Sequence, residues 1–159
     1  MKLEEIVVTK LYEKNLVLSC AESCTGGLIA KRITDVSGSS AVFNCGIVSY
    51  SNEIKEKVLG VKHETLEQFG AVSEQTVREM VQGALEISGS DIAVSVSGIA
   101  GPNSDNTDKP VGLIFLAVSD GKETVVKKLN NSFSDDIRNS NRTSASDEAL
   151  KMIIKMIGD

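Results

Sequence analysis

Residues 16–27 have the sequence Leu-Val-Leu-Ser-Cys-Ala-Glu-Ser-Cys-Thr-Gly-Gly, and a helical pattern follows from about Leu28 to Val36. The run Leu16–Ala21 is mostly apolar and has the length of a buried β-strand. A short apolar run that passes through a glycine-rich turn into a helix is typical of α/β proteins, in which helices pack on a sheet. This stretch therefore predicts a strand, a turn and a helix in direct succession.

The same alternation of strand and helix patterns continues along the chain. We expect further strands at 46–50, 91–97, 111–119 and 123–129, and helices at 3–13, 52–58, 63–69, 73–88 and around 149–157. Asp120-Gly121 is a tight-turn signal, so the last two strands form an antiparallel hairpin, whereas the polar residues 130–144 predict a loop. The fold class is therefore α/β, with a mostly parallel, mixed sheet covered by helices on both faces.

The composition favours a globular protein and argues against several classes of partner. The 159 residues predict a single domain over 1–159, since domains hold about 100–200 residues. The net charge is −5 and no run of Lys or Arg is present, which argues against nucleic-acid binding. No apolar stretch approaches the roughly 18 residues of a membrane span, and the amino terminus carries acids where a signal peptide is apolar. We expect a cytoplasmic protein without a membrane partner.

Histidine and cysteine are scarce, which limits the possible metal and catalytic sites. The chain has one histidine, His63, and three cysteines, Cys20, Cys24 and Cys45. Zinc sites mostly use four Cys or His ligands, with paired cysteines about three positions apart, whereas Cys20 and Cys24 are four apart. We therefore expect no metal site, and an odd number of cysteines without a secretion signal predicts reduced thiols.

Polar segments follow three of the predicted strands directly: Glu22–Gly27, Tyr50–Lys55 and Ser97–Pro102. Ligands of such sheets bind beyond the carboxyl ends of the strands, so we expect these segments to converge on one cleft. Within the first segment, Ser23 is a candidate nucleophile, and the amides around Thr25–Gly27 at the start of the helix are candidate donors to an anion. The alternative is an ordinary capping residue before a glycine-rich turn.

A nucleophilic serine needs a base, and Lys55 is the candidate because the only histidine lies elsewhere. The alternative is a solvated helix lysine. Cys24 is a competing nucleophile or a buried structural cysteine, and His63 lies on a polar stretch that favours a surface position. Arg138 and Arg142 are four positions apart; on a helix they would share a face and either bind a phosphate or remain solvated.

Six motifs in order resemble one family, the CinA C-terminal domain family, over about residues 5–157. They are Ala21-Glu22-Ser23-Cys24-Thr25-Gly26-Gly27, Gly38-Ser39-Ser40, Tyr50-Ser51-Asn52, Gly70-Ala71-Val72-Ser73-Glu74, Ser97-Gly98-Ile99-Ala100-Gly101-Pro102 and Lys109-Pro110-Val111-Gly112. The family includes stand-alone nicotinamide-nucleotide amidohydrolases, and this chain, without the larger amino-terminal domain of full-length members, is similar to that form.

The resemblance implies a three-layer α/β/α sandwich and the hydrolysis of nicotinamide mononucleotide to nicotinate mononucleotide and ammonia. It implies a catalytic serine–lysine pair at Ser23 and Lys55, with Tyr50 beside it, and no cofactor. It also implies a homo-oligomer, most simply a dimer. The substrate-binding residues that it and the patterns point to are Thr25, Gly26, Gly27, Ser97, Gly98, Gly101, Arg138 and Arg142.

Two segments depart from the family pattern. Residues 103–107 are Asn-Ser-Asp-Asn-Thr where members usually carry glycines, and residues 133–138 are Phe-Ser-Asp-Asp-Ile-Arg where members have Phe-x-Gly-Asp-Arg. Both changes add negative charge near an expected phosphate site. They leave two alternatives open, a nucleotide-binding or regulatory module with weak turnover and an amidohydrolase for another amide.

Overall fold

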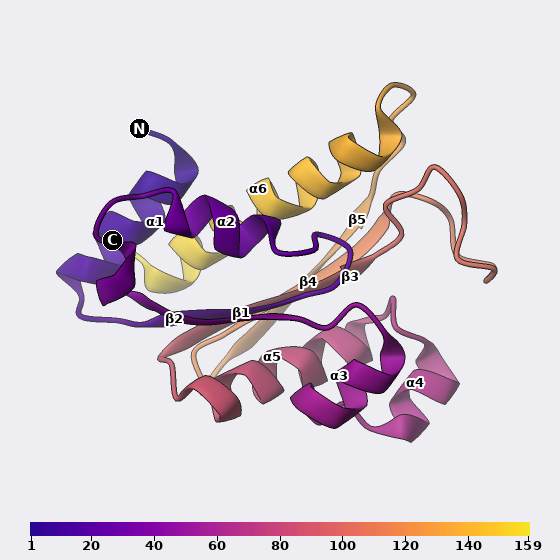
Figure 1. Ribbon diagram of the computed structural model, residues 1–159, viewed down its shortest axis with the longest axis horizontal. Coiled ribbons are helices and arrows are strands. Elements are labelled where there is room, and N and C mark those ends of the chain that lie inside the picture. Colours follow the sequence, from indigo (N-terminus) through magenta and orange to yellow (C-terminus); the bar gives the residue numbers. More distant parts are fainter.

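Five strands form one sheet in the order β2-β1-β3-β4-β5 in the computed structural model, which describes residues 1–159 (Figure 1). β1 pairs in parallel with β2 and β3, whereas β4 runs antiparallel to both β3 and β5. The strands are β1 (Leu18–Glu22), β2 (Phe43–Val48), β3 (Ile92–Gly98), β4 (Leu113–Ser119) and β5 (Thr124–Asn130). Only β4 opposes the common direction, which confirms the mostly parallel, mixed sheet.

Helices cover both faces of this sheet, so the three-layer α/β/α architecture is confirmed (Figure 1). One face carries α1 (Leu3–Glu13), α2 (Leu28–Thr34) and α6 (Ile137–Ile157), and the other carries α3 (Asn52–Leu59), α4 (His63–Phe69) and α5 (Glu74–Ser88). A short 3-10 helix, η1 (Ser39–Ala41), follows α2. No helix combines the length and the apolar character that crossing a bilayer requires.

The hydrophobic core lies in two layers because successive side chains of a strand point to opposite faces. The larger layer packs branched side chains of α1, α2 and α6 on the sheet, among them Leu11 and Ile33 against Leu18. The other layer packs Met80 of α5 on small strand residues such as Ala93. Alanine in the strands lets α5 approach the sheet closely, and α3 packs in turn against α5.

The helix that carries Lys55 is defined by local signals at both ends. Ser51 caps α3, since its hydroxyl accepts a hydrogen bond from the Ile54 amide, so the expected cap, Asn52, is off by one residue. Gly60 ends the helix with φ +72°, as predicted. Gly83 of α5 lies under the end of α3: a Cβ at this position would stand 2.0 Å from the Leu59 carbonyl oxygen. Only glycine permits this close contact, which fixes α3, the helix that carries Lys55, against α5.

The last helix begins earlier than the sequence pattern predicts. The polar residues 130–144 were expected as a loop, whereas α6 begins at Ile137. The expectation was wrong because polar side chains of the first turns bind loop carbonyls instead of apolar partners: Asn141, for example, is buried and donates to the Ala100 carbonyl oxygen at 2.9 Å. A buried helix face made of hydrogen-bonding residues carries no hydrophobic period.

Candidate active site

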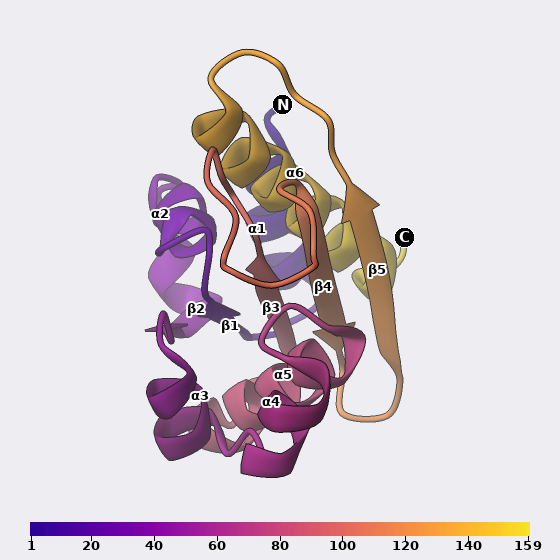
Figure 2. The same cartoon turned by 90° about the vertical axis from the view of Figure 1, so that its right-hand side faces the viewer.

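The polar segments after β1, β2 and β3 converge at the carboxyl edge of the sheet, as predicted. They line a cavity of about 760 Å³, which lies within the range of small-molecule sites. The wall includes Ser23 and Cys24 after β1, Tyr50 and Lys55 after β2, and residues 97–101 after β3. Figure 2 shows the segment between β3 and β4 passing between α6 on one side and α3 and α4 on the other, and this segment closes the cavity.

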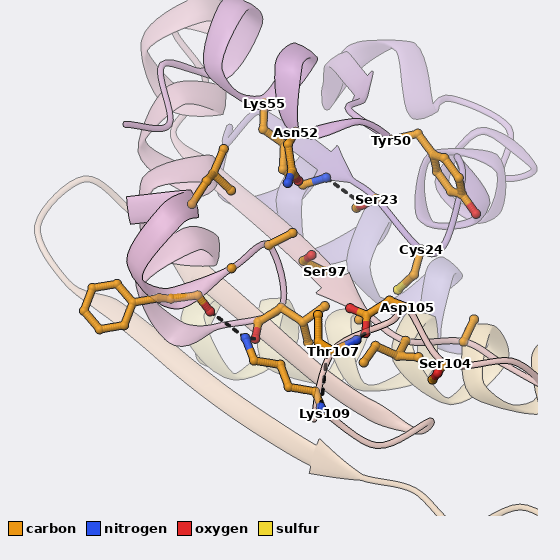
Figure 3. Close-up of a pocket in the computed structure, with 18 of the residues that line it drawn as sticks. Ser23, Cys24, Tyr50, Asn52, Lys55, Ser97, Ser104, Asp105, Thr107 and Lys109 are labelled. Atoms are coloured by element: carbon orange, nitrogen blue, oxygen red, sulfur yellow. Dashed lines mark hydrogen bonds between the residues drawn. The ribbon is translucent and has the colours of Figure 1, made fainter. Parts of the chain in front are cut away.

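Ser23 and Lys55 are hydrogen-bonded to each other in this wall (Figure 3). Lys55 Nζ donates to Ser23 Oγ at 2.9 Å and to the Ser49 carbonyl oxygen at 2.7 Å. The lysine side chain is 1% exposed and has no carboxylate partner, so desolvation lowers its pKa to about 8. The geometry therefore provides a hydroxyl next to an amine that loses its proton near neutral pH.

The turn that carries Ser23 is held by backbone hydrogen bonds. The Ser23 amide donates to the Val96 carbonyl oxygen of β3, and the Gly26 amide donates to the Ser23 carbonyl oxygen at 3.0 Å. Gly26 and Gly27 have φ of +59° and +102°, a backbone conformation that side chains disfavour. The glycine pair thus allows the chain to reverse at once from β1 into α2, which leaves Ser23 at the end of the strand.

Glu22, which sequence reasoning did not single out, occupies the start of α2. Its carboxylate is 1% exposed and accepts hydrogen bonds from the amides of Ile29 at 2.9 Å and Ala30 at 3.0 Å. These amides belong to the first turn of the helix and are therefore not available to an anionic ligand. The available signal was an acid at the end of a predicted strand, six positions before the predicted helix, and it gave no indication that the side chain accepts hydrogen bonds from the start of that helix.

The candidate oxyanion donors include one amide that was not expected. Of the Thr25–Gly27 amides, that of Gly26 already donates to the Ser23 carbonyl oxygen. The amide of Cys24, directly after the serine, donates to no protein oxygen, and Cys24 lines the cavity. Thr25 is fully buried, and Thr25, Gly26 and Gly27 all lie outside the cavity wall. The structure therefore adds the Cys24 amide to the candidates.

Arg138 and Tyr50 form a hydrogen-bonded pair at the rim of the cavity. Arg138 Nη2 donates to the Tyr50 hydroxyl at 2.9 Å, and its Nη1 donates to the Gly101 carbonyl oxygen at 2.8 Å. Tyr50 forms no hydrogen bond with Lys55, and Figure 3 shows its ring directed away from the amine. The Ser49 carbonyl oxygen orients Lys55 in this structure. Four of the predicted substrate-binding residues lie in the cavity wall: Ser97, Gly98, Gly101 and Arg138.

Arg142 lies outside the wall, on the same face of α6 as Arg138. Its Nε donates to the Cys24 carbonyl oxygen at 3.1 Å and its Nη2 to the Thr25 carbonyl oxygen at 2.8 Å. The helical face that the four-residue spacing predicted is present, but the two arginines bind different segments. Arg142 therefore binds the backbone of the serine-bearing turn from outside the cavity wall.

Several wall residues were not predicted from the sequence. Lys109 Nζ donates to the Phe69 and Val72 carbonyl oxygens and thereby ties the β3–β4 segment to the α4–α5 turn (Figure 3). Three carboxylates also line the cavity, those of Glu67, Asp105 and Asp108. Asp105 belongs to the 103–107 segment that departs from the family pattern, so this departure alters the cavity itself.

The competing residues have less suitable surroundings. Burial raises the pKa of the Cys24 thiol to about 12, so it is protonated at neutral pH and a poor nucleophile. His63 is exposed, lies outside the cavity wall and bonds Glu56 through Nδ1 at 2.6 Å, and this hydrogen bond raises its pKa. Ser23 and Lys55 therefore remain the best-placed nucleophile and base.

The sequence of the chain matches one family model over nearly its whole length. Residues 1–157 match the CinA C-terminal domain. The chain belongs to this family. Among solved structures of the CinA superfamily, the competence/damage inducible protein CihA from Agrobacterium tumefaciens superposes with a TM-score of 0.91 at 41% identity, over 98% of this chain and 96% of that one.

Relatives of this CinA-family chain differ in length. The nicotinamide-nucleotide amidohydrolase PncC of Enterobacter agglomerans is 54% identical over 126 residues, which cover 79% of this chain and 76% of that protein. A CinA-like protein of Kosmotoga olearia is also 54% identical, over 127 residues that cover 80% of this chain but 31% of the relative. The chain thus spans about a third of the length of the longer curated relatives it matches.

Proposed function

We propose that this chain is an amidohydrolase that converts nicotinamide mononucleotide and water into nicotinate mononucleotide and ammonia. The observation that carries the proposal is the Ser23–Lys55 hydrogen bond inside a cavity of substrate size. The 54% identity to an amidohydrolase named for this class of substrate supports it. The single-domain organisation over 1–159, the homo-oligomer, the cytoplasmic location and the absence of a cofactor stay predictions.

In the first step, Ser23 attacks the carboxamide of the substrate. The neutral amine of Lys55 accepts the hydroxyl proton while Ser23 Oγ forms a bond to the carboxamide carbon. The π electrons of the carbonyl move to its oxygen, and the Cys24 amide, next to the nucleophile, donates to this oxyanion. The Ser49 carbonyl oxygen accepts from one N–H of Lys55 and so holds the nitrogen 2.9 Å from Ser23 Oγ, where the neutral amine can accept the serine proton.

In the second step, the carbon–nitrogen bond breaks and Lys55 returns its proton to the leaving nitrogen, which departs as ammonia. An ester between Ser23 and the nicotinoyl group remains. A water molecule then attacks this ester, Lys55 takes the proton of the water, and Ser23 recovers it as the ester bond breaks. Each proton that Lys55 accepts is released within the same half-reaction, so the enzyme returns to its starting state.

Two basic side chains of the wall, those of Lys55 and Arg138, would meet the pyridinium ring and the phosphate of this substrate. The buried amine of Lys55 disfavours a second positive charge, so a pyridinium ring beside it lowers the pKa of the amine further. Arg138 at the rim keeps N–H groups for a phosphate because its two protein acceptors use only part of the guanidinium. The phosphate is therefore proposed to lie between Arg138 and the residues 97–101.

A second candidate is a nucleotide-binding module with little turnover. Asp105 and Asp108 favour it, because they place two carboxylates in the wall of a cavity that would receive an anionic phosphate. Repulsion would weaken the positioning of the substrate. An amidohydrolase for a less anionic amide is the related alternative.

Ammonia release from nicotinamide mononucleotide distinguishes these candidates. Nicotinamide and nicotinamide riboside serve as controls, since they lack the ribose phosphate and the phosphate, respectively. Turnover that requires the phosphorylated substrate is expected. Tight binding of the nucleotide without ammonia release would favour the binding module, and faster turnover of the riboside would indicate another amide as the substrate.

A further inference from the structure

Two peptide groups in series connect Arg142 to the amide beside the nucleophile. Arg142 Nη2 donates to the Thr25 carbonyl oxygen at 2.8 Å, and the same peptide group carries the Gly26 N–H. That N–H donates to the Ser23 carbonyl oxygen at 3.0 Å, and the Ser23 peptide group carries the Cys24 N–H. Because C=O and N–H of a trans peptide point in opposite directions, the chain of contacts leads from the guanidinium to the free Cys24 amide.

We propose that Arg142 is a positioning residue that orients and polarises the oxyanion-binding amide of Cys24, an assignment that rests on the proposed amide hydrolysis at Ser23. A cation at one end of a hydrogen-bonded chain draws electron density toward itself, so each N–H along the chain becomes a stronger donor. The guanidinium also bonds the Cys24 carbonyl oxygen through Nε, so it holds two successive carbonyls with a planar group.

The placement of Arg142 distinguishes this role from phosphate binding. Arg142 lies outside the cavity wall, whereas Arg138 of the same helix face is part of it. The contacts of Arg142 are to backbone oxygens of the serine-bearing turn and not to the cavity. A group that acts on the oxyanion affects the transition state, while a phosphate ligand binds ground state and transition state alike.

The surrounding turn supports this assignment. A Cβ at Gly26 would stand 3.4 Å from Arg142 Nη2, so the guanidinium packs directly on the turn. Gly26 and Gly27 have no side chain and lie in the left-handed region, so the turn has little intrinsic stiffness of its own. The arginine therefore supplies the rigidity that a preorganised oxyanion site requires.

The test measures Arg142→Gln and Arg142→Lys against Arg78→Gln, which removes an exposed arginine of α5 outside the cavity. For Arg142→Gln, kcat for nicotinamide mononucleotide should fall about 10- to 100-fold, somewhat less than the loss of an oxyanion donor, while KM stays within about twofold. Arg142→Lys should lie between wild type and Gln, because an ammonium keeps the charge without the planar fork. A raised KM with unchanged kcat would instead make Arg142 a phosphate ligand.

A second readout does not depend on the natural substrate. A fluorophosphonate reagent phosphonylates an activated serine and releases fluoride. Its phosphoryl oxygen would accept a hydrogen bond from the same oxyanion donor, the Cys24 amide. Mass spectrometry of the intact protein measures the rate at which Ser23 is labelled. This rate should fall about 10-fold or more in Arg142→Gln and remain unchanged in Arg78→Gln. If the wild type is labelled in this arginine-dependent way but does not hydrolyse the nucleotide, the proposed function fails and the positioning role stands. Labelling that is equal in wild type and Arg142→Gln, or absent from both, would overturn the positioning role of Arg142.

Discussion

Lys55 Nζ lies 2.9 Å from Ser23 Oγ, although 32 residues separate the two in the chain. The amine is buried, its other partner is the Ser49 carbonyl oxygen, and no carboxylate balances its charge. This arrangement makes the neutral amine accessible near pH 8 and places its lone pair next to a hydroxyl. The predictions below follow from this pair and from the groups that hold it.

Ser23→Ala should abolish turnover while substrate binding is retained. In the proposed mechanism Ser23 forms the covalent bond, so kcat should fall by at least about a thousandfold, since nucleophile and base act as a unit. Steady-state ammonia release and binding of the nucleotide by calorimetry check this. Cys24→Ala is the matched control, because it removes the neighbouring side chain but keeps the backbone amide; a Ser23→Ala protein with more than about a tenth of wild-type kcat would place the nucleophile elsewhere.

The activity should rise with pH as Lys55 loses its proton. In kcat/KM, which reports the free enzyme, the rise should centre near pH 8, the pKa of the buried amine. In kcat, which reports the complex, it should centre lower, because the pyridinium charge disfavours the protonated amine. Initial rates between pH 5 and 10 check both profiles.

Two variants identify the group behind this pH dependence. Lys55→Arg keeps the charge but cannot deprotonate in this range, so it should lose nearly all activity. His63→Ala should leave the profile unchanged, because His63 lies outside the cavity wall. An active Lys55→Arg enzyme, or a profile that disappears with His63→Ala, would contradict the serine–lysine mechanism.

Lys55→Met should stabilise the fold at neutral pH at the expense of activity. The pKa of Lys55 is about 8 in the folded chain against 10.5 in the unfolded one, so burying the charge costs about 3 kcal/mol below pH 8. Between pH 8 and 10.5 the folded lysine is neutral and the unfolded one still protonated, so wild-type stability rises with pH. Since Met also loses two hydrogen bonds, we expect a gain of about 1–2 kcal/mol at pH 7 that shrinks by pH 10. Urea unfolding at both pH values checks this; a pH-independent difference would contradict it.

Glu22→Ala should lower both stability and kcat. The substitution leaves the buried Ile29 amide and the half-buried Ala30 amide without the carboxylate acceptor, at a cost of about 1–3 kcal/mol for a buried unsatisfied group. The turn next to Glu22 carries Ser23, so the Ser23 side chain should be held less rigidly and kcat should fall. Thermal unfolding and kcat measure the two effects, and Glu22→Gln should lie between Ala and wild type because one amide oxygen remains. A variant with wild-type stability would show that the carboxylate is dispensable.

Arg138→Ala should raise KM more than it lowers kcat. Arg138 lines the cavity and keeps free N–H groups at its rim, and a phosphate contact contributes mostly uniform binding. The dependence of ammonia release on nucleotide concentration measures both constants. An unchanged KM would remove Arg138 from the phosphate site, and a comparable loss of binding affinity for the riboside would show that the contact is not to the phosphate.

Local sequence patterns were sufficient for the fold class and made Ser23 and Lys55 candidates, and the family resemblance pointed to the same two residues as a pair. The apolar run before Glu22, the glycines after it and the caps around α3 and α5 act over a few residues, through backbone geometry that is visible in the sequence. The parallel strands then bring their carboxyl ends together, which is why Ser23 and Lys55 could be selected in advance.

Only the tertiary structure decided how the surroundings of this pair are built. Glu22 caps α2 from inside the protein, and Arg142 reaches back 117 residues to the Thr25 carbonyl oxygen. The polar start of α6 was expected as a loop because its partners are backbone oxygens, which carry no sequence signal. The low pKa of Lys55 likewise depends on desolvation by distant segments. Hydrogen bonds and burial between remote segments arise from packing, whereas periodicity and turn chemistry are local properties of the chain.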